Sequence, residues 1–316
     1  MISASDLMHA EIIRKRMLTP SVCEFTFTVD DGNLPTFEPG SHITVETPSG
    51  AMRRYSLVND GRNSPENYVI AIKSETTSRG GSLSMHEQTE EGTILRISPP
   101  ENTFPLKEAA DYLLIAGGIG ITPIYSMARH LTDLGKSFRI IYCTKNVDDS
   151  PYLDELKNKF NAKLLVNHTL GVAENRFDFW DYFAKIKNMH VYCCGPEPLT
   201  EEIKAISGHW PEGRVNFEDF KPVEVTRADD VAFEVTLQKS NQTITIPADR
   251  SILEAIRDSG IDTISSCESG TCGSCKSRLI KGDVDHRDMV LMDDEKADQI
   301  MICVSRPATG DLTIDL

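Results

Sequence analysis

Four of the 8 cysteines lie close together near the end of the chain, and their spacing allows metal chemistry. Cys267, Cys272 and Cys275 follow a C-x4-C-x2-C pattern, and Cys303 comes after 27 further residues. Plant-type ferredoxins bind a [2Fe-2S] cluster with this spacing. Structural zinc sites use two closely spaced pairs, whereas the fourth cysteine here stands alone. The spacing predicts an iron–sulfur cluster; a zinc site and a set of buried thiols are the alternatives.

A glycine-rich turn suggests a nucleotide site. The apolar run 112–116 precedes Gly117-Gly118-Ile119-Gly120, and Ile121-Thr122-Pro123 reads as a helix start. A strand, a glycine turn and a helix direct helix N–H groups at a pyrophosphate. Pro123 replaces the third glycine of the usual motif, which the first helical turn tolerates. A plain tight turn would show the same pattern.

Cys194-Gly195-Pro196 ends another apolar run. A thiol at such a strand end would touch a nicotinamide ring, and the alternative is a buried core cysteine.

Two short motifs in the first hundred residues suggest a flavin. Arg53-Arg54-Tyr55-Ser56-Leu57 supplies a flat ring with hydrogen-bond donors, and Arg79-Gly80-Gly81-Ser82 supplies a charge and free backbone N–H groups. Those groups suit one phosphate. Either motif alone would also fit an ordinary surface, but both precede the nucleotide turn.

The elements that must position these residues change character along the chain. Short alternating strands at 23–29, 42–46, 68–73 and 93–97 predict a small antiparallel barrel or sandwich, and a barrel is the form expected for a flavin domain. From about residue 106, strands alternate with helices, which predicts a parallel sheet covered on both faces. After a polar linker, a hairpin, a short helix and the cysteine loop form a small α+β, β-grasp-like unit. The predicted domains are 1–105 for flavin, 106–222 for NAD, a linker at 223–230, and 231–316 for the ferredoxin domain.

Composition restricts the function classes. The chain has 316 residues and a formal net charge of −15, so non-specific binding to a phosphate backbone is excluded. The 40% hydrophobic and 26% charged content is typical of globular proteins rather than of disorder. No run of about 18 apolar residues and no signal-peptide pattern occur, so we expect a cytoplasmic protein.

These motifs, in this order, resemble the phthalate dioxygenase reductase family over the whole chain. Vanillate demethylase reductases and carnitine monooxygenase reductase subunits are similar. The resemblance implies an NADH-dependent reductase with FMN and [2Fe-2S] that serves a separate Rieske-type oxygenase as a monomer. Hydride would pass from NADH to FMN, and single electrons would pass through the cluster to the oxygenase.

The resemblance also assigns residues. FMN would contact Arg53, Tyr55, Ser56 and Leu57 at its ring and ribityl chain, Ile72 and Lys73 at its edge, and Arg79, Gly80, Gly81 and Ser82 at its phosphate. NADH would contact Gly118, Gly120, Thr122 and Pro123 at its pyrophosphate, Thr144 and Lys145 at its ribose, and Cys194, Gly195 and Pro196 at its nicotinamide.

Ser56, Cys194 and Phe220 are the residues expected at the reaction site. Phe220 would shield the flavin, although a hydrophobic residue at a domain end would read the same way. Lys145 tolerates a 2′-phosphate better than an aspartate would, so NADH rather than NADPH follows from the resemblance alone. Arg54 is given no role.

Two other classes of protein stay open on the residues. One is a carrier or sensor in which the first 220 residues only regulate; the other is a stand-alone flavin reductase of small acceptors. The acidic runs at 283–285 and 293–295 would steer the cluster domain to a basic partner, or would be solvated loops.

Overall fold

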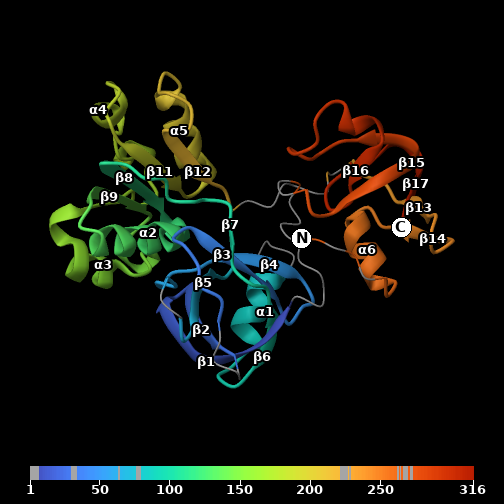
Figure 1. Ribbon diagram of the computed structural model, residues 1–316, viewed down its shortest axis with the longest axis horizontal. Coiled ribbons are helices and arrows are strands. Elements are labelled where there is room, and N and C mark those ends of the chain that lie inside the picture. Colours follow the sequence, from blue (N-terminus) through green and yellow to red (C-terminus); the bar gives the residue numbers. More distant parts are fainter. Residues whose placement is uncertain are drawn as a thin grey trace. The chain divides into compact units, whose positions relative to one another are not determined.

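The computed structural model describes the chain except residues 1–6, 30–33, 63–64, 76–79, 221–226, 228, 262, 264, 266–269 and 271–272. The chain divides into two compact units, Met8–Phe220 and Met1–Leu7 with Lys221–Leu316. Figure 1 labels most of the helices and strands of both units. None of the described helices is long and apolar enough to cross a membrane.

The first half of the unit Met8–Phe220 is an antiparallel sheet. Its strand order is β4-β3-β6-β1-β2-β5, and β7 pairs with β3. An isolated bridge between Leu57 and Ile70 links the β4 end of the sheet to β5, so the sheet curves into the predicted barrel. Phe25, Phe27 and Ile43 are fully buried inside it. The elements are β1 (Met8–Thr19), β2 (Val22–Thr28), β3 (Ser41–Glu46), β4 (Met52–Ser56), β5 (Tyr68–Lys73), α1 (Gly81–Glu87), β6 (Ile94–Ile97) and β7 (Glu101–Asn102).

The second half of this unit is a parallel sheet in the order β10-β9-β8-β11-β12. Its strands are β8 (Asp111–Gly117), β9 (Ser137–Thr144), β10 (Leu164–His168), β11 (His190–Cys194) and β12 (Val215–Glu218), and its helices are α2 (Ile121–Asp133), α3 (Leu153–Phe160), α4 (Trp180–Phe183) and α5 (Glu197–Ser207). Short 3-10 turns are η2 (Gly118–Gly120), η3 (Val147–Asp149), η4 (Asn161–Lys163) and η5 (Ala173–Asn175).

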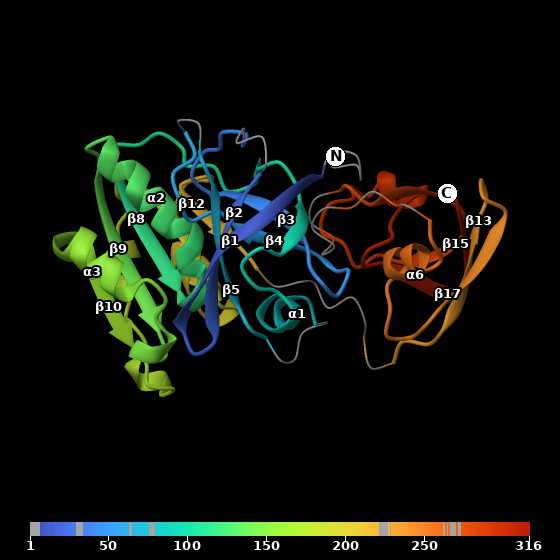
Figure 2. The same ribbon diagram turned by 90° about the horizontal axis from the view of Figure 1, so that it is seen from below.

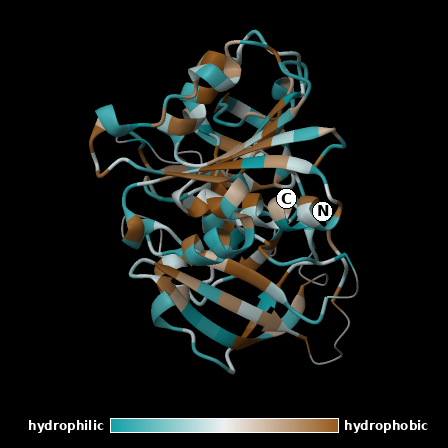
Figure 3. Cartoon of the chain, turned by 90° about the vertical axis from the view of Figure 1, so that its left-hand side faces the viewer, coloured by the Kyte–Doolittle hydropathy of each residue, from teal (hydrophilic) through white to brown (hydrophobic). Residues whose placement is uncertain are grey.

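Alternate residues of β8 enter two different cores, as the pleat requires. Leu114 packs in the core that contains α2 and α3, whereas Leu113 packs in the core beside α4 and α5. The first of these cores also holds Val58 and Ala71 from the barrel. Figure 2 shows α2 between the parallel sheet and the barrel strands, and Figure 3 shows apolar residues along the sheet. The barrel and the parallel sheet are therefore joined by a shared apolar core.

The unit that ends at Leu316 is a mixed sheet in the order β14-β13-β17-β15-β16. A hairpin of β13 and β14 is antiparallel, while β13 pairs with β17 in parallel. A capping box of Ser251 and Glu254 begins the helix α6, whose apolar side packs in the domain core. The elements are β13 (Phe233–Leu237), β14 (Gln242–Ile246), α6 (Ile252–Asp258), β15 (Lys276–Asp285), η6 (Glu295–Ala297), β16 (Gln299–Met301) and β17 (Arg306–Ile314). This is the predicted ferredoxin-like α+β arrangement.

Buried charges fasten the end of the predicted linker to this domain. Two Arg287 nitrogens donate to Asp230 at 2.6 and 2.8 Å, and Arg306 donates to the carbonyl of Val231 at 3.0 Å. Hydrogen bonds from Arg287 lower the pKa of Asp230 to about 2. The side chains of Arg287, Asp230 and Arg306 are each almost fully buried. Most of the linker 223–230 lies outside the described residues, and its boundaries stay a prediction.

Candidate functional site

The two motifs predicted to bind flavin come together at one side of the barrel. Strand β4 carries Arg53, Tyr55 and Ser56, and it pairs with β3 in a regular antiparallel register. A Cβ atom added at Gly81 would lie 3.1 Å from Cγ of Arg53, so the second motif packs directly on the first. Gly80 has φ +82°, a conformation that favours glycine. Arg79 lies outside the described residues.

Other residues of this predicted set have varied surroundings. Burial raises the pKa of the Tyr55 hydroxyl well above its ordinary value. Ile72 is buried in the barrel core, and Lys73 pairs with Glu75 at 2.6 Å. The Ser82 hydroxyl accepts a hydrogen bond from the Glu75 backbone at 3.1 Å. Leu57 is buried in the same core as Ile72, so its side chain faces the barrel interior.

The predicted pyrophosphate turn packs on the predicted nicotinamide turn. A Cβ atom at Gly120 would lie 2.2 Å from the carbonyl oxygen of Cys194, and one at Gly117 would lie 2.5 Å from Cδ of Pro196. Gly118 differs, because it has φ +55° and nothing lies within 4 Å of its missing side chain. The turn is therefore closed on one side and open on the other, at the start of α2.

The remaining residues of that turn are fixed by local contacts. Thr122 donates to the carbonyl of Ile119 at 3.1 Å, and Pro123 is buried in the first turn of α2. Gly195 lies so close to Gly117 that a Cβ atom there would be 2.9 Å from the Gly117 backbone. The structure thus brings all seven predicted pyrophosphate and nicotinamide residues to neighbouring ends of β8 and β11.

The predicted ribose residues stand at the end of β9. The Thr144 hydroxyl lies 2.7 Å from both Ser150 Oγ and His168 Nδ1, and it is nearly buried. Lys145 is exposed beside it. Of the pair, Lys145 is the side chain that has freedom to reach a ligand.

Three polar side chains converge where the barrel meets the parallel sheet. Ser56 Oγ donates to Oε2 of Glu218 at 3.5 Å. Cys194 of β11 pairs in register with Glu218 of β12, so their side chains lie on the same face of the sheet. Ser56 and Cys194 are predicted site residues, whereas Glu218 is not among the predictions.

The electrostatics of this group favour uncharged forms. Burial raises the pKa of the Glu218 carboxyl to about 8, although the positive charge of Arg54 and the hydrogen bond from Ser56 oppose that rise. Burial raises the pKa of the Cys194 thiol well above its ordinary value, and the nearby Glu218 adds to the effect. At neutral pH the group therefore holds a protonated thiol and a largely protonated carboxyl.

Glu218 and Arg54 are what the sequence reasoning missed. The available signal was position, because Glu218 ends the last strand of the parallel sheet and ligands bind at the carboxyl ends of such strands. Phe220 follows two residues later and its side chain is 41% exposed. Its shielding role stays a prediction.

In the other unit, strand pairing brings two of the four predicted cluster ligands together. Cys275 directly precedes β15, and Cys303 follows β16, which pairs antiparallel with β15. The backbone N–H of Ile302 donates to the carbonyl of Cys275 at 3.4 Å. Both cysteines are buried. Cys267 and Cys272 lie outside the described residues.

Glycines shape the loop that carries these ligands. Gly270 has φ +70°, and a Cβ atom there would lie 2.8 Å from Val304 and 3.1 Å from the Asp288 backbone. Its carbonyl accepts a hydrogen bond from Met289 at 3.0 Å. Gly273 also has a positive φ. Gly270 therefore packs closely against Val304, which follows Cys303, and against the segment at Asp288.

Two family models match the chain, one in each unit. An oxidoreductase NAD-binding domain matches residues 114–205, which contain the glycine turn and the Cys194 turn. A 2Fe-2S iron–sulfur cluster binding domain matches residues 235–308, which contain all four predicted ligands. The chain thus carries a [2Fe-2S] domain and an NAD-binding domain.

Full-length relatives extend these matches. Phthalate dioxygenase reductase of Burkholderia cepacia is 44% identical, with 98% of this chain and 97% of that protein covered. The oxygenase reductase subunit of phthalate 4,5-dioxygenase of Pseudomonas putida is 46% identical, with 97% and 96% covered. A solved phthalate dioxygenase reductase structure, described as modular for electron transfer from pyridine nucleotides to [2Fe-2S], superposes with a TM-score of 0.87 over 99% of this chain and 98% of that one, at 44% identity. The chain therefore belongs to the phthalate dioxygenase reductase family and is an NAD(P)H-dependent oxidoreductase, the flavin- and [2Fe-2S]-containing reductase component of a multicomponent oxygenase.

Proposed function

We propose that this reductase takes electrons from NADH through FMN and its [2Fe-2S] cluster to a Rieske-type oxygenase. The observation that carries the proposal is the convergence of Ser56 from the barrel with Cys194 and Glu218 from the parallel sheet. A flavin held on the barrel and a nicotinamide held on the sheet would meet at that point.

The barrel residues fit a flavin with a single phosphate. Arg53 lies against Gly81, and the left-handed Gly80 turns the backbone beside it. Gly80 and Gly81, together with Arg79 and Ser82, would offer backbone donors and positive charge to one phosphate group, beside Arg53 at the ring and ribityl chain. Tyr55 and Ser56 on β4 would hold the ring and the ribityl chain, with Leu57, Ile72 and Lys73 beside them.

The parallel sheet fits a dinucleotide. Open space above Gly118 leaves room for a pyrophosphate at the start of α2, a helix whose N-terminal N–H groups favour negative charge. Gly120, Thr122 and Pro123 form the rest of that turn. Lys145 would contact the adenosine ribose beside Thr144, and NADH is the proposed coenzyme.

When bound, a flavin accepts a hydride from the nicotinamide and releases electrons one at a time, as a cluster requires. The work of the chain is to position the two rings and to exclude water. Cys194 and Glu218 present neutral polar groups to the reaction site, with Ser56 holding Glu218 by a hydrogen bond. Gly195, Pro196 and Phe220 would border the nicotinamide and the flavin.

The cluster domain supplies the exit for electrons. Cys267, Cys272, Cys275 and Cys303 are the proposed ligands. Residues 226–316 hold 17 acidic and 10 basic side chains, and this negative charge suits a transient complex with a basic partner surface. We also propose that the protein is a cytoplasmic monomer with domains 1–105, 106–222 and 231–316.

Release and identification of the flavin is the first experiment. Protein purified and denatured in acid should release FMN, one per chain, seen by chromatography and mass spectrometry. Release of FAD, or of no flavin, would overturn the FMN assignment. NADH should reduce the flavin faster than NADPH at equal concentration, and the reverse order would overturn the coenzyme assignment.

A substitution of Ser56 tests whether its contact with Glu218 matters for flavin reduction. Ser56→Ala should slow flavin reduction by NADH about tenfold or more, because the hydroxyl that holds Glu218 at the reaction site is lost. Ser98→Ala is the matched control, since Ser98 is a buried barrel serine bonded to the Thr44 backbone at 2.9 Å. An equal slowing in both variants would show that the effect is structural.

A further inference from the structure

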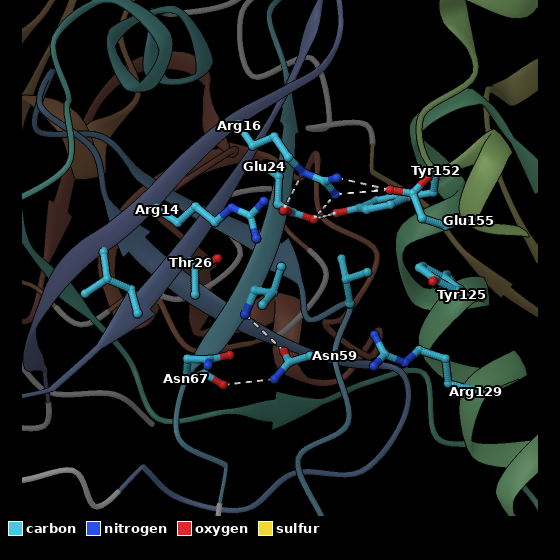
Figure 4. A pocket seen from close by; sticks show the side chains of 13 residues that line it. Arg14, Arg16, Glu24, Thr26, Asn59, Asn67, Tyr125, Arg129, Tyr152 and Glu155 are labelled. Atoms are coloured by element: carbon cyan, nitrogen blue, oxygen red, sulfur yellow. Dashed lines mark hydrogen bonds and ion pairs between the residues drawn. The ribbon is translucent and has the colours of Figure 1, made fainter. Parts of the chain in front are cut away.

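A pocket of about 500 Å³ lies between the barrel and the parallel sheet, within the unit Met8–Phe220. Strands β1, β2 and β5 form one wall, and α2 and α3 form the other (Figure 4). Its volume is within the range of small-molecule sites. None of the residues assigned above to flavin, NADH or the cluster lines it, so it is a separate site.

The charges around this pocket do not cancel. Three arginines and two glutamates line it. Both carboxylates are engaged, because Arg16 donates to Glu24 at 3.0 Å and to Glu155 at 3.2 Å, and the Tyr152 hydroxyl donates to Glu24 at 2.8 Å. The pocket therefore keeps a positive balance in a chain whose formal net charge is −15.

The two arginines that are not paired with these glutamates lie on opposite walls. Arg14 comes from β1 and Arg129 comes from α2, and both side chains border the pocket (Figure 4). Within the described part of the chain, neither has a carboxylate or a hydrogen-bond partner for its guanidinium; Arg129 lies over the Tyr125 ring at 5.5 Å. Guanidinium groups prefer planar carboxylates, which they bind with two parallel hydrogen bonds.

The space between the two arginines is partly apolar. Val58 and Val69 line it together with the Tyr125 ring, and Tyr125 is only 7% exposed. In the described residues the Tyr125 hydroxyl has no hydrogen-bond partner, so it is a further donor at the wall. An apolar body with charge at two ends matches these surroundings better than a compact inorganic anion.

We propose that this pocket binds a small organic dicarboxylate, with its carboxylates on Arg14 and Arg129 and its apolar body against Tyr125 and the two valines. Because these residues come from the barrel and from α2, the bound ligand would bridge the flavin and nucleotide domains. Binding would raise the temperature at which this unit unfolds, since the ligand binds only the folded form.

The experiment is calorimetric titration of the holoprotein with three probes: benzene-1,3-dicarboxylate, benzoate and inorganic phosphate. The dicarboxylate should bind one site per chain, and benzoate and phosphate should bind at least about tenfold more weakly, since each lacks either one carboxylate contact or the apolar body. Absence of saturable dicarboxylate binding at millimolar concentration would overturn the proposal, as would phosphate binding of equal strength.

Substitutions of the two arginines test whether the dicarboxylate binds in this pocket. Arg14→Gln and Arg129→Gln should each raise the Kd for the dicarboxylate at least about tenfold, with NADH–ferricyanide turnover unchanged in the absence of the anion. Arg176→Gln removes the same charge from an exposed residue outside the pocket and should leave the Kd unchanged. Unchanged binding in the Arg14→Gln/Arg129→Gln double variant, or equal weakening by Arg176→Gln, would overturn the site.

Discussion

Two carboxyl groups, one in each unit, have pKa values shifted in opposite directions. Glu218 ends the last strand of the parallel sheet, and burial raises its pKa to about 8. Asp230 lies at the start of the cluster domain, where hydrogen bonds from Arg287 lower its pKa to about 2. The first is a largely neutral group beside a predicted reaction site, whereas the second is a permanently charged member of a structural ion pair.

The difference teaches how each site is built. The reaction site joins side chains that two sheets bring together, and the positive charge of Arg54 only partly offsets the desolvation of Glu218. The proposed cluster ligands all lie within one small domain, and the Asp230 ion pair attaches the linker end to that domain. Changes in one unit should therefore leave the other working.

The largest effect should come from a cluster ligand. Cys303→Ser should abolish the electron paramagnetic resonance signal of the reduced cluster and NADH–cytochrome c turnover, because one of four thiolate ligands is lost. Flavin reduction by NADH should persist, since that site lies in the other unit. Cys143→Ser, on the parallel sheet, should keep both activities. Loss of flavin reduction in Cys303→Ser would contradict the independence of the two units.

Breaking the buried ion pair should have the next largest effect. Arg287→Met leaves the charge of Asp230 buried without its main partner, which should cost the cluster domain about 3–5 kcal/mol. The measurement is the urea midpoint of cluster bleaching, read from visible absorption.

The control for that variant is an exposed pair. Asp258→Asn removes the partner of Arg250, and Asp258 is 64% exposed, so the loss should be about 1 kcal/mol or less. The two tryptophans, Trp180 and Trp210, both lie in the other unit, and their fluorescence midpoint should not move in either variant. Equal losses in Arg287→Met and Asp258→Asn would refute the buried-pair account.

Glu218 should make the flavin and nucleotide unit less stable as pH rises. Between pH 4.5, the ordinary pKa of a glutamate, and about pH 8, the folded form keeps the Glu218 proton whereas the unfolded form has released it. The free energy of unfolding therefore falls through this range, by on the order of 3 kcal/mol at pH 7. Glu218→Gln should remove that fall, measured as urea midpoints by tryptophan fluorescence from pH 5 to 8.

An exposed glutamate is the control for the pH series. Glu212→Gln should keep the wild-type slope, because Glu212 is exposed at the surface of the same unit. If Glu218→Gln and wild type lose stability equally between pH 5 and 8, the carboxyl is not the neutral group described here.

The smallest of these effects should come from the nucleotide turn. Gly120→Ala would place Cβ 2.2 Å from the Cys194 carbonyl, so the two turns must separate, at a cost of about 1–3 kcal/mol and a higher KM for NADH. Gly118→Ala meets open space, and its positive φ costs only about 1 kcal/mol. A larger loss of stability in Gly118→Ala than in Gly120→Ala would contradict the packing of the two turns.

The sequence predicted those structures that are formed by residues close together in the chain. The cysteine pattern predicted the [2Fe-2S] domain, and the apolar run before the glycine turn predicted β8 and α2. Strand β1 was missed because the charged run Arg14, Lys15 and Arg16 interrupts its alternation, and the register shifts between Ile12 and Arg14. The helix α1 was missed as well, since it is only seven residues long and begins inside the Arg-Gly-Gly-Ser motif.

The meeting of Ser56 with Glu218 had no counterpart in the sequence spacing, because the two residues are far apart along the chain and come from different sheets. The raised pKa of Glu218 comes from its burial, which the hydrogen bond from Ser56 only partly offsets, so it follows from the fold alone. The sequence did not predict the pocket arginines either, because Arg14 and Arg129 are also far apart along the chain and come from different elements.

The central claim is that electrons enter at the flavin and leave through the cluster. Anaerobic stopped-flow mixing with NADH tests it most directly, with flavin and cluster absorbance followed at separate wavelengths. The account predicts that flavin bleaching precedes cluster reduction, and that Cys303→Ser keeps the first phase and loses the second. Cluster reduction before flavin bleaching, or in protein stripped of flavin, would contradict it.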